Sequence, residues 1–167
     1  RSLDFEACRN FQVDNFDPWT TYDGDGYGTW GISGADFENS GYTGSFIAFN
    51  ASRTDPPLGE NWAAHGGNRC GICFAATDGN NSTTTDTNND WLMSTAVTLG
   101  SNSSFSFWAK SVSSSYIERF KVLVSTTNNN TSSFTKISAG NYIEPSTEWT
   151  QYTYNLSAYD GQTIYRS

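Results

Sequence analysis

Basic residues are scarce in this sequence. Nine Lys and Arg stand against seventeen Asp and Glu among 167 residues, which gives a formal net charge of −8. The nine are not clustered, so we expect no nucleic-acid partner, because phosphates require a basic face. No apolar run approaches the length of about 18 residues that a membrane-spanning helix requires, and no membrane insertion is expected.

Histidine and cysteine are rarer still, with one and three residues. His65 is the only imidazole, and no G-x-S-x-G signature accompanies it, so the sequence does not predict a catalytic triad. Cys70 and Cys73 have C-x-x-C spacing but lack a second such pair, which makes zinc binding a weak hypothesis. Cys8 and Cys70 could form a disulfide in an oxidising compartment, and the sequence leaves the pairing open. We expect a protein that is not an enzyme, with a glycoside hydrolase as a distant alternative because it needs only two carboxylates.

The residues that are abundant favour strands. Aromatic residues make up 16% of the chain, and most of the remainder is Ser, Thr, Asn and Gly, a composition typical of all-β extracellular domains. The segments 78–90 and 126–133 are polar and low in complexity and predict surface loops. Apolar alternation or short apolar runs predict strands at 3–8, 28–33, 45–50, 70–76, 91–99, 104–110, 117–125, 133–138, 148–156 and 163–165. The fold class expected is therefore an all-β sandwich.

The segment from Trp19 to Trp30 suggests a metal site. It contains Asp23-Gly24-Asp25-Gly26, and alternating Asp and Gly can turn several oxygens toward one Ca²⁺ ion. Tyr27 occupies the position where an EF-hand requires a third acid or amide, so the segment is not an EF-hand. The alternative is a solvated Asp-Gly turn between two strands.

Aromatic residues in polar segments suggest a saccharide-binding surface, because an aromatic ring offers an apolar plate to the C–H face of a sugar. The candidates are Tyr22, Tyr27, Trp30 and Trp62. By contrast, Trp91, Trp108 and Trp149 lie in predicted strands, and we assign them to the interior.

The order of several motifs resembles a known family. These motifs are Asp4-Phe5-Glu6, Trp19 to Gly26, His65-Gly66-Gly67, Asn89 to Leu99, Phe105 to Lys110, Val124 to Thr127, and the C-terminal Leu156 to Gly161. Together they resemble the cleaved-adhesin or choice-of-anchor J domains of Bacteroidetes, which are related to the gingipain adhesin domains and, distantly, to MAM domains. The resemblance implies a jelly-roll β-sandwich of two antiparallel sheets with structural Ca²⁺, in a secreted or bacterial cell-surface protein.

The resemblance also implies site residues and partners. Glu6 matches the family's recurrent acidic ligand, Asp23 and Asp25 gain support as ligands, and the backbone carbonyls of Ala64 and His65 are candidates to face the ion. Asp90 is expected to cap its own loop through side-chain hydrogen bonds. The expected partner is a glycan or an extracellular or host surface protein.

One feature departs from the family. Relatives have a further closing strand after the segment that matches Leu156 to Gly161. We therefore expect 1–167 to be a single module that lacks this strand, with an open sheet edge available to strand exchange or to a neighbouring chain.

Overall fold

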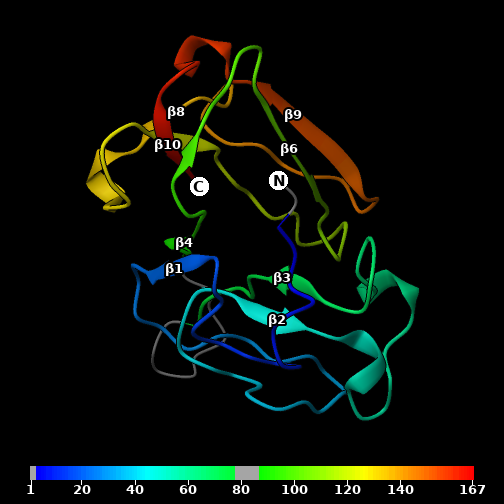
Figure 1. Cartoon of the computed structure of the whole chain (residues 1–167). Coiled ribbons are helices and arrows are strands. Elements are labelled where there is room, and N and C mark those ends of the chain that lie inside the picture. Colours follow the sequence, from blue (N-terminus) through cyan, green and yellow to red (C-terminus); the bar gives the residue numbers. More distant parts are fainter. Residues whose placement is uncertain (1–2, 78–86) are drawn as a thin grey trace. The chain divides into compact units, whose positions relative to one another are not determined.

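The computed structural model describes residues 3–77 and 87–167 (Figure 1). The chain forms two compact units, Arg1–Leu92 and Met93–Ser167, hereafter unit 1 and unit 2. Strands are the main regular structure of both units, and every strand pair with a defined register is antiparallel. The expected all-β class is thus confirmed, whereas the jelly-roll topology and the single module remain predictions. No helix among the described residues has the length and apolarity needed to cross a membrane.

Unit 1 holds two small sheets. Strand β1 (Thr20–Asp23) pairs with β4 (Asp90–Met93), whose last residue is the first of unit 2. Strand β2 (Ile47–Phe49) pairs with β3 (Cys70–Ile72), with Phe49 opposite Cys70. The connection between β2 and β3 contains two 3-10 helices, Ala51–Arg53 and Glu60–Trp62.

Aromatic residues form most of the core of unit 1. Phe49 on β2 is 1% exposed, and its ring meets those of Phe11 and Phe74 edge-on at centroid distances of 5.5 and 6.0 Å. Trp62 packs against the same cluster, 5.9 Å from the Phe49 ring. A second cluster joins Cys8, Phe16 and Ala48. Burial of these large rings is the main term that favours folding of this unit.

Unit 2 is built around a four-stranded sheet. Its strand order is β5-β10-β7-β8, from Val97–Thr98, Thr163–Arg166, Leu123–Ser125 and Thr135–Lys136 respectively. Ile164 on β10 is fully buried and packs with Val124 and Leu156. Two further 3-10 helices, Thr131–Ser133 and Ser157–Tyr159, lie in the connections.

A two-stranded ribbon completes unit 2. Strands β6 (Ser104–Ala109) and β9 (Thr150–Asn155) pair along their whole length and lie side by side in Figure 1. Their burial alternates residue by residue, as the sequence pattern predicts for strands with one covered face. Phe107 stacks on Tyr152 at 5.6 Å on that covered face.

Several predicted strands are absent from the structure or begin and end at other residues. Residues 3–8 form bends and a turn in place of a strand, with the Cys8 N–H donating to the Phe5 carbonyl. The predicted strand 28–33 is reduced to isolated bridges, and 91–99 divides into β4 and β5. Strand β1 was not predicted at all, because its residues Thr20–Asp23 are mostly polar and read as part of a loop. Most of the predicted loop 78–90 lies outside the described residues.

The C-terminal segment forms an inner strand of its sheet. The predicted strand 163–165 is observed as β10, Thr163–Arg166, with β5 on one side and β7 on the other. Hydrogen bonds continue past its end, because Ser167 and Leu123 exchange a pair at 3.0 and 2.8 Å. The strands with one free side in this sheet are β5 and β8. A further closing strand stays a prediction.

Candidate metal centre

The end of β1 and the start of β4 bring two acidic segments together within unit 1. Asp23 is the last residue of β1, and Asp90 is the first residue of its partner β4. The Gly24 N–H donates to the Asn89 carbonyl at 2.9 Å, which continues the pairing beyond the strands. The sheet thereby places Asp90 beside the Asp-Gly loop, although 64 residues separate it from Asp25 in sequence.

The loop from Asp23 to Tyr27 is folded by its own carboxylates. Asp23 Oδ1 accepts hydrogen bonds from the N–H groups of Asp25 and Gly26 at 3.2 and 2.7 Å. Asp25 Oδ1 accepts one from Tyr27 N–H at 2.9 Å. Gly26 has a φ of +71°, a conformation that glycine adopts without a steric penalty. Asp-Gly alternation therefore forms a sharp turn with its acids on the inner side, as the sequence indicates.

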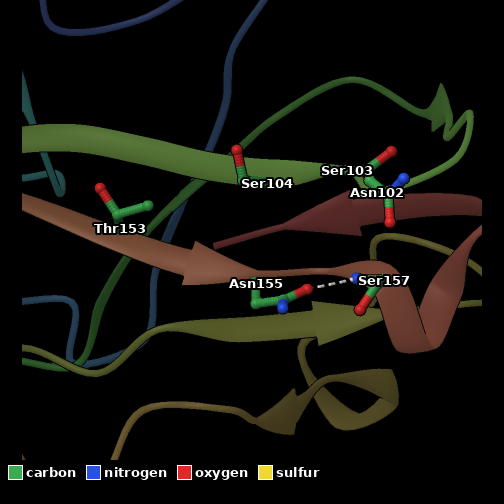
Figure 2. A pocket seen from close by; sticks show the side chains of 6 residues that line it. All are labelled: Asn102, Ser103, Ser104, Thr153, Asn155 and Ser157. Carbon is green, nitrogen blue, oxygen red and sulfur yellow. Dashed lines mark hydrogen bonds between the residues drawn. The ribbon is translucent and has the colours of Figure 1, made fainter.

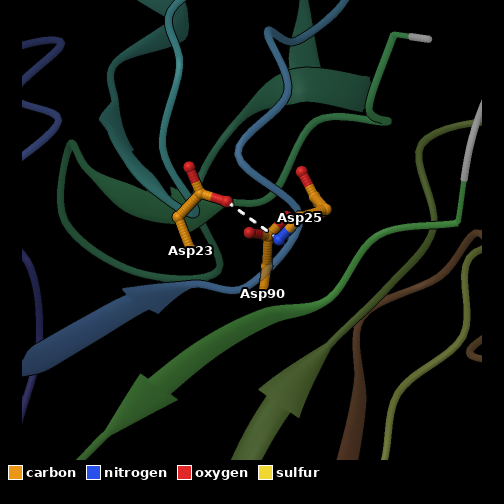
Figure 3. A group of neighbouring side chains, drawn as sticks. All are labelled: Asp23, Asp25 and Asp90. Carbon is orange, nitrogen blue, oxygen red and sulfur yellow. Dashed lines mark hydrogen bonds between the residues drawn. The ribbon is translucent and has the colours of Figure 1, made fainter. Parts of the chain in front are cut away.

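Three carboxylates converge on one point. Oxygens of Asp23, Asp25 and Asp90 lie within 4.8 Å of one another, and all three residues are partly buried (Figure 3). Asp25 is also tied to the β4 side, because its Oδ2 accepts from Asn89 N–H at 2.8 Å. Hard oxygen donors at this spacing suit Ca²⁺, which takes six to eight oxygens.

Asp90 sits in the least solvated part of the cluster. Its Oδ2 accepts from Asn88 Nδ2 at 2.9 Å and from the Cys73 thiol at 3.3 Å. Its Oδ1 is shielded from solvent and has no hydrogen-bond partner among the described residues. Burial raises the pKa of Asp90 to about 6, and the negative charges of Asp25 and Asp23 add to the rise, while the two hydrogen bonds oppose it. A cation bound here would give Asp90 Oδ1 a partner and would offset the repulsion among the three carboxylates.

Asn88 holds the carboxylate of Asp90 in place. Its amide donates to the Phe74 carbonyl at 2.8 Å as well as to Asp90, and its oxygen accepts from Ala76 N–H at 2.7 Å. These contacts attach the start of β4 to the segment after β3. The side chain of Asp90 is thus held by Asn88, two residues before it, and by Cys73 on the segment after β3.

Glu6 lies outside this acidic group. Its Oε1 accepts from the N–H groups of Asn68 and Arg69 at 2.8 and 2.7 Å, and Oε2 lies 3.5 Å from the Arg69 guanidinium. The Arg69 N–H bond is the largest of the effects that lower the pKa of Glu6. Glu6 thus stands on a turn, not on the strand that we predicted, and already has cationic and N–H partners. Ala64 and His65 lie in the loop that precedes these partners, with His65 exposed.

The predicted metal ligands therefore do not all lie together: Asp23 and Asp25 belong to the acidic group, and Glu6 does not. Among the described residues, the one group of acids with metal-binding spacing is Asp23, Asp25 and Asp90. The sequence identified the first two as ligands, but it assigned Asp90 to loop capping. The available signal was the run Asn88-Asn89-Asp90 directly before a strand, yet only the β1–β4 pairing shows which carboxylates meet.

The aromatic candidates separate into two groups. Tyr22 and Trp30 are 48% and 37% exposed, whereas Tyr27 is half-buried. Trp62, a loop candidate for saccharide stacking, is partly buried and packs on the unit 1 core. Trp108 is the reverse error, because we assigned it to the interior and it is 42% exposed on β6.

None of Cys8, Cys70 and Cys73 forms a disulfide. Cys8 is buried in the second core cluster, and desolvation is the main cause that raises its pKa. Cys73 is half-buried and contributes its thiol to the surroundings of Asp90. Among the described residues no disulfide links the acidic segments, which are joined by hydrogen bonds and by the β1–β4 pairing.

No family model, curated protein or solved structure matches the chain significantly. The resemblance to cleaved-adhesin domains therefore stays a prediction.

Proposed function

We propose that this chain is a non-catalytic, calcium-stabilised extracellular binding module that serves adhesion or substrate targeting. The observation that carries the proposal is the convergence of Asp23, Asp25 and Asp90 within 4.8 Å. Three carboxylates so close together repel one another unless a cation neutralises them. The resemblance to secreted and cell-surface adhesin domains agrees with this reading.

The donor set favours calcium over softer metals. All three groups offer carboxylate oxygen, which Ca²⁺ and Mg²⁺ prefer, whereas structural zinc sites are built mainly from thiolate and imidazole. His65 and Cys73 are not members of the group. The three residues would hold the ion through Asp23, Asp25 and the unpaired Oδ1 of Asp90, and the ion would supply charge neutralisation and a bridge between two segments.

Such an ion would stabilise the loop that it binds. It would link residues 23–25 to the start of β4, and binding to the folded state alone raises stability by mass action. The result would be a rigid loop next to Tyr22 and Tyr27. Calcium is proposed here as a structural ion, not as a catalytic one.

A protein-binding adhesin is the second candidate. Unit 2 exposes Tyr116, Ile117 and Tyr142 at 79%, 39% and 41%, which are large apolar side chains of the kind that protein partners cover. Arg119 lies over the Tyr142 ring at 4.1 Å and adds a cation to this surface. Glycoside hydrolysis remains a distant third proposal.

The test is thermal unfolding in excess Ca²⁺, in excess Mg²⁺ and in EGTA. Calcium is expected to raise the melting temperature, and EGTA to reverse the rise. Asp23→Asn and Asp25→Asn are expected to abolish the response, whereas Asp14→Asn, an exposed acid of the same unit outside the cluster, retains it. Equal melting in calcium and EGTA would contradict the calcium proposal.

A further inference from the structure

The outward face of the β6–β9 ribbon in unit 2 has an unusual composition. Side chains alternate between the two faces of the ribbon, and the covered face carries Phe105, Phe107, Tyr152 and Tyr154. Phe105 lies opposite Tyr154, and Phe107 lies opposite Tyr152. The opposite face carries Ser104, Ser106, Trp108, Gln151, Thr153 and Asn155, all exposed. We call these six residues the ribbon face.

The ribbon face is uncharged. It carries hydroxyl and amide groups and one indole, on a chain with a net charge of −8. Within the described residues, the side chains of Ser104, Ser106 and Thr153 make no hydrogen bond, so their hydroxyls are available to a ligand. A neutral partner rich in hydroxyl groups matches this chemistry, whereas an acidic partner would be repelled by the chain as a whole.

A small open pocket lies at one end of the ribbon face. It has a volume of about 200 Å³ and is lined by Asn102, Ser103, Ser104, Thr153, Asn155 and Ser157 (Figure 2). Asn155 Oδ1 accepts from Ser157 N–H at 2.8 Å, which orients the amide and leaves its NH₂ group for a ligand.

Asp160 fixes the other side of this pocket. Its carboxylate oxygens accept from the N–H groups of Asn102 and Ser103 at 2.8 and 3.3 Å. The pocket is therefore bordered by a loop whose backbone is held by Asp160, with Ser103 Oγ adding a 3.4 Å hydrogen bond to the Gly100 carbonyl. Pre-positioned polar groups lower the entropy cost of binding.

Trp108 stands at the other end, opposite Gln151. Trp108 is four positions after Ser104 on β6, a span of about 13 Å at the usual rise of a strand. An indole 42% exposed beside an amide is a suitable platform for a sugar ring, since the ring offers C–H groups to the indole and hydroxyls to the amide.

We propose that the ribbon face binds a short neutral oligosaccharide, with one sugar stacked on Trp108 and another in the pocket at Asn155. This inference rests on the proposed function as a binding module and specifies its ligand class and location. It assigns the saccharide site to unit 2 and not to the candidates of unit 1, which are Tyr22, Tyr27, Trp30 and Trp62.

The test uses affinity gel electrophoresis and calorimetry with neutral probes: glucan, mannan, xylan and galactan polysaccharides and their short oligosaccharides. We expect at least one probe to bind. Trp108→Ala and Asn155→Ala are each expected to weaken binding about tenfold or more, while Trp108→Phe retains part of the affinity because it keeps a ring. Asn141→Ala, which removes an exposed amide of unit 2 outside the ribbon face, serves as the matched control for Asn155→Ala and leaves affinity unchanged, while Trp30→Ala tests the competing site on unit 1.

The outcomes are distinct. Absence of binding to every neutral probe by the folded wild-type protein overturns the inference, and so does binding that Trp30→Ala abolishes and Trp108→Ala does not. Binding of collagen or fibronectin through the ribbon face, without any saccharide, also overturns it. Each titration is repeated in Ca²⁺ and in EGTA: saccharide binding that persists without any calcium response in melting would refute the metal site alone.

Discussion

At the scale of single residues, Asp90 determines the chemistry of the acidic cluster. It combines a solvent-shielded oxygen without a partner, two neighbouring carboxylates and a pKa raised to about 6. In the metal-free protein, the folded state holds the Asp90 proton up to about pH 6, whereas the unfolded chain loses it near the ordinary value of 3.8. The folded state therefore binds more protons between these pH values, and the free energy of unfolding falls as pH rises through this window.

Asp90→Asn should remove that dependence. In EGTA, we expect the variant to be more stable than wild type at pH 7–8 by about 1–2 kcal/mol, allowing for partial solvation of the carboxyl. Its stability should also change less between pH 4 and pH 7. Urea unfolding across this range measures both effects, with Asp14→Asn as a control that keeps the wild-type slope. A wild-type curve that rises over the same window would contradict the assignment.

Gly24 is the second residue on which the cluster depends. A Cβ atom at this position would lie 2.7 Å from the Asn89 carbonyl oxygen, too close for the β1 end and the β4 start to keep their pairing. We expect Gly24→Ala to destabilise the protein by about 1–3 kcal/mol and to weaken calcium binding.

Gly59→Ala is the matched control for this substitution. Gly59 belongs to the same unit, has a φ of −78°, and has open space where a Cβ would be placed. Chemical denaturation should show little change or a slight gain in stability for it. Equal losses in the two variants would mean that close contact with Asn89 is not the cause.

At the scale of elements, substitutions in β10 test whether this strand belongs to the core of unit 2. It is flanked by β5 and β7, and Ile164 in its middle is fully buried against Val124 and Leu156. We expect Ile164→Ala to cost about 2–5 kcal/mol, because it leaves a cavity in this core. The neighbouring Thr163→Ala removes only an exposed cross-strand hydrogen bond to Thr98, and should cost under about 1 kcal/mol. Guanidinium unfolding compares the two, and similar losses would show that β10 is not a core strand.

The elements also show how far sequence reasoning reaches. The predicted strands 104–110 and 148–156 are confirmed as β6 and β9, and burial alternates along both of them. The same reasoning misplaced Trp108, because an aromatic residue in a strand was assumed to face inward, although its position in the alternation puts it on the exposed side. Strand β1 was missed since its partner β4, and not its own composition, makes it a strand.

The candidate site follows the same rule. Local turn chemistry predicts the Asp23–Asp25 loop, which forms through hydrogen bonds within five residues. The third carboxylate, Asp90, depends on a long-range pairing that no local pattern encodes. Glu6 illustrates the converse: the resemblance assigned it to the ion, but Arg69 and two backbone N–H groups already neutralise it.

At the scale of the whole molecule, the acidic cluster and the ribbon face belong to different units. Hydrogen exchange followed by mass spectrometry should therefore show calcium protection at residues 20–28 and 87–93, with little change in β6 and β9. The physical reason is that a bound ion raises the cost of local opening where it joins two segments. Saccharide binding should instead protect β6 and β9 and leave residues 20–28 and 87–93 little changed. Uniform protection across both units by calcium would indicate one cooperative structure and would contradict local clamping.

The most direct measurement is calorimetric titration of the chelator-treated protein with Ca²⁺. The account predicts one ion bound at the cluster, with binding lost in Asp25→Asn and Asp90→Asn, weakened below about pH 6 as Asp90 takes up its proton, and unchanged in Glu6→Gln. A wild-type protein that binds no calcium, or binding that survives loss of Asp25 and Asp90 but fails in Glu6→Gln, would contradict it.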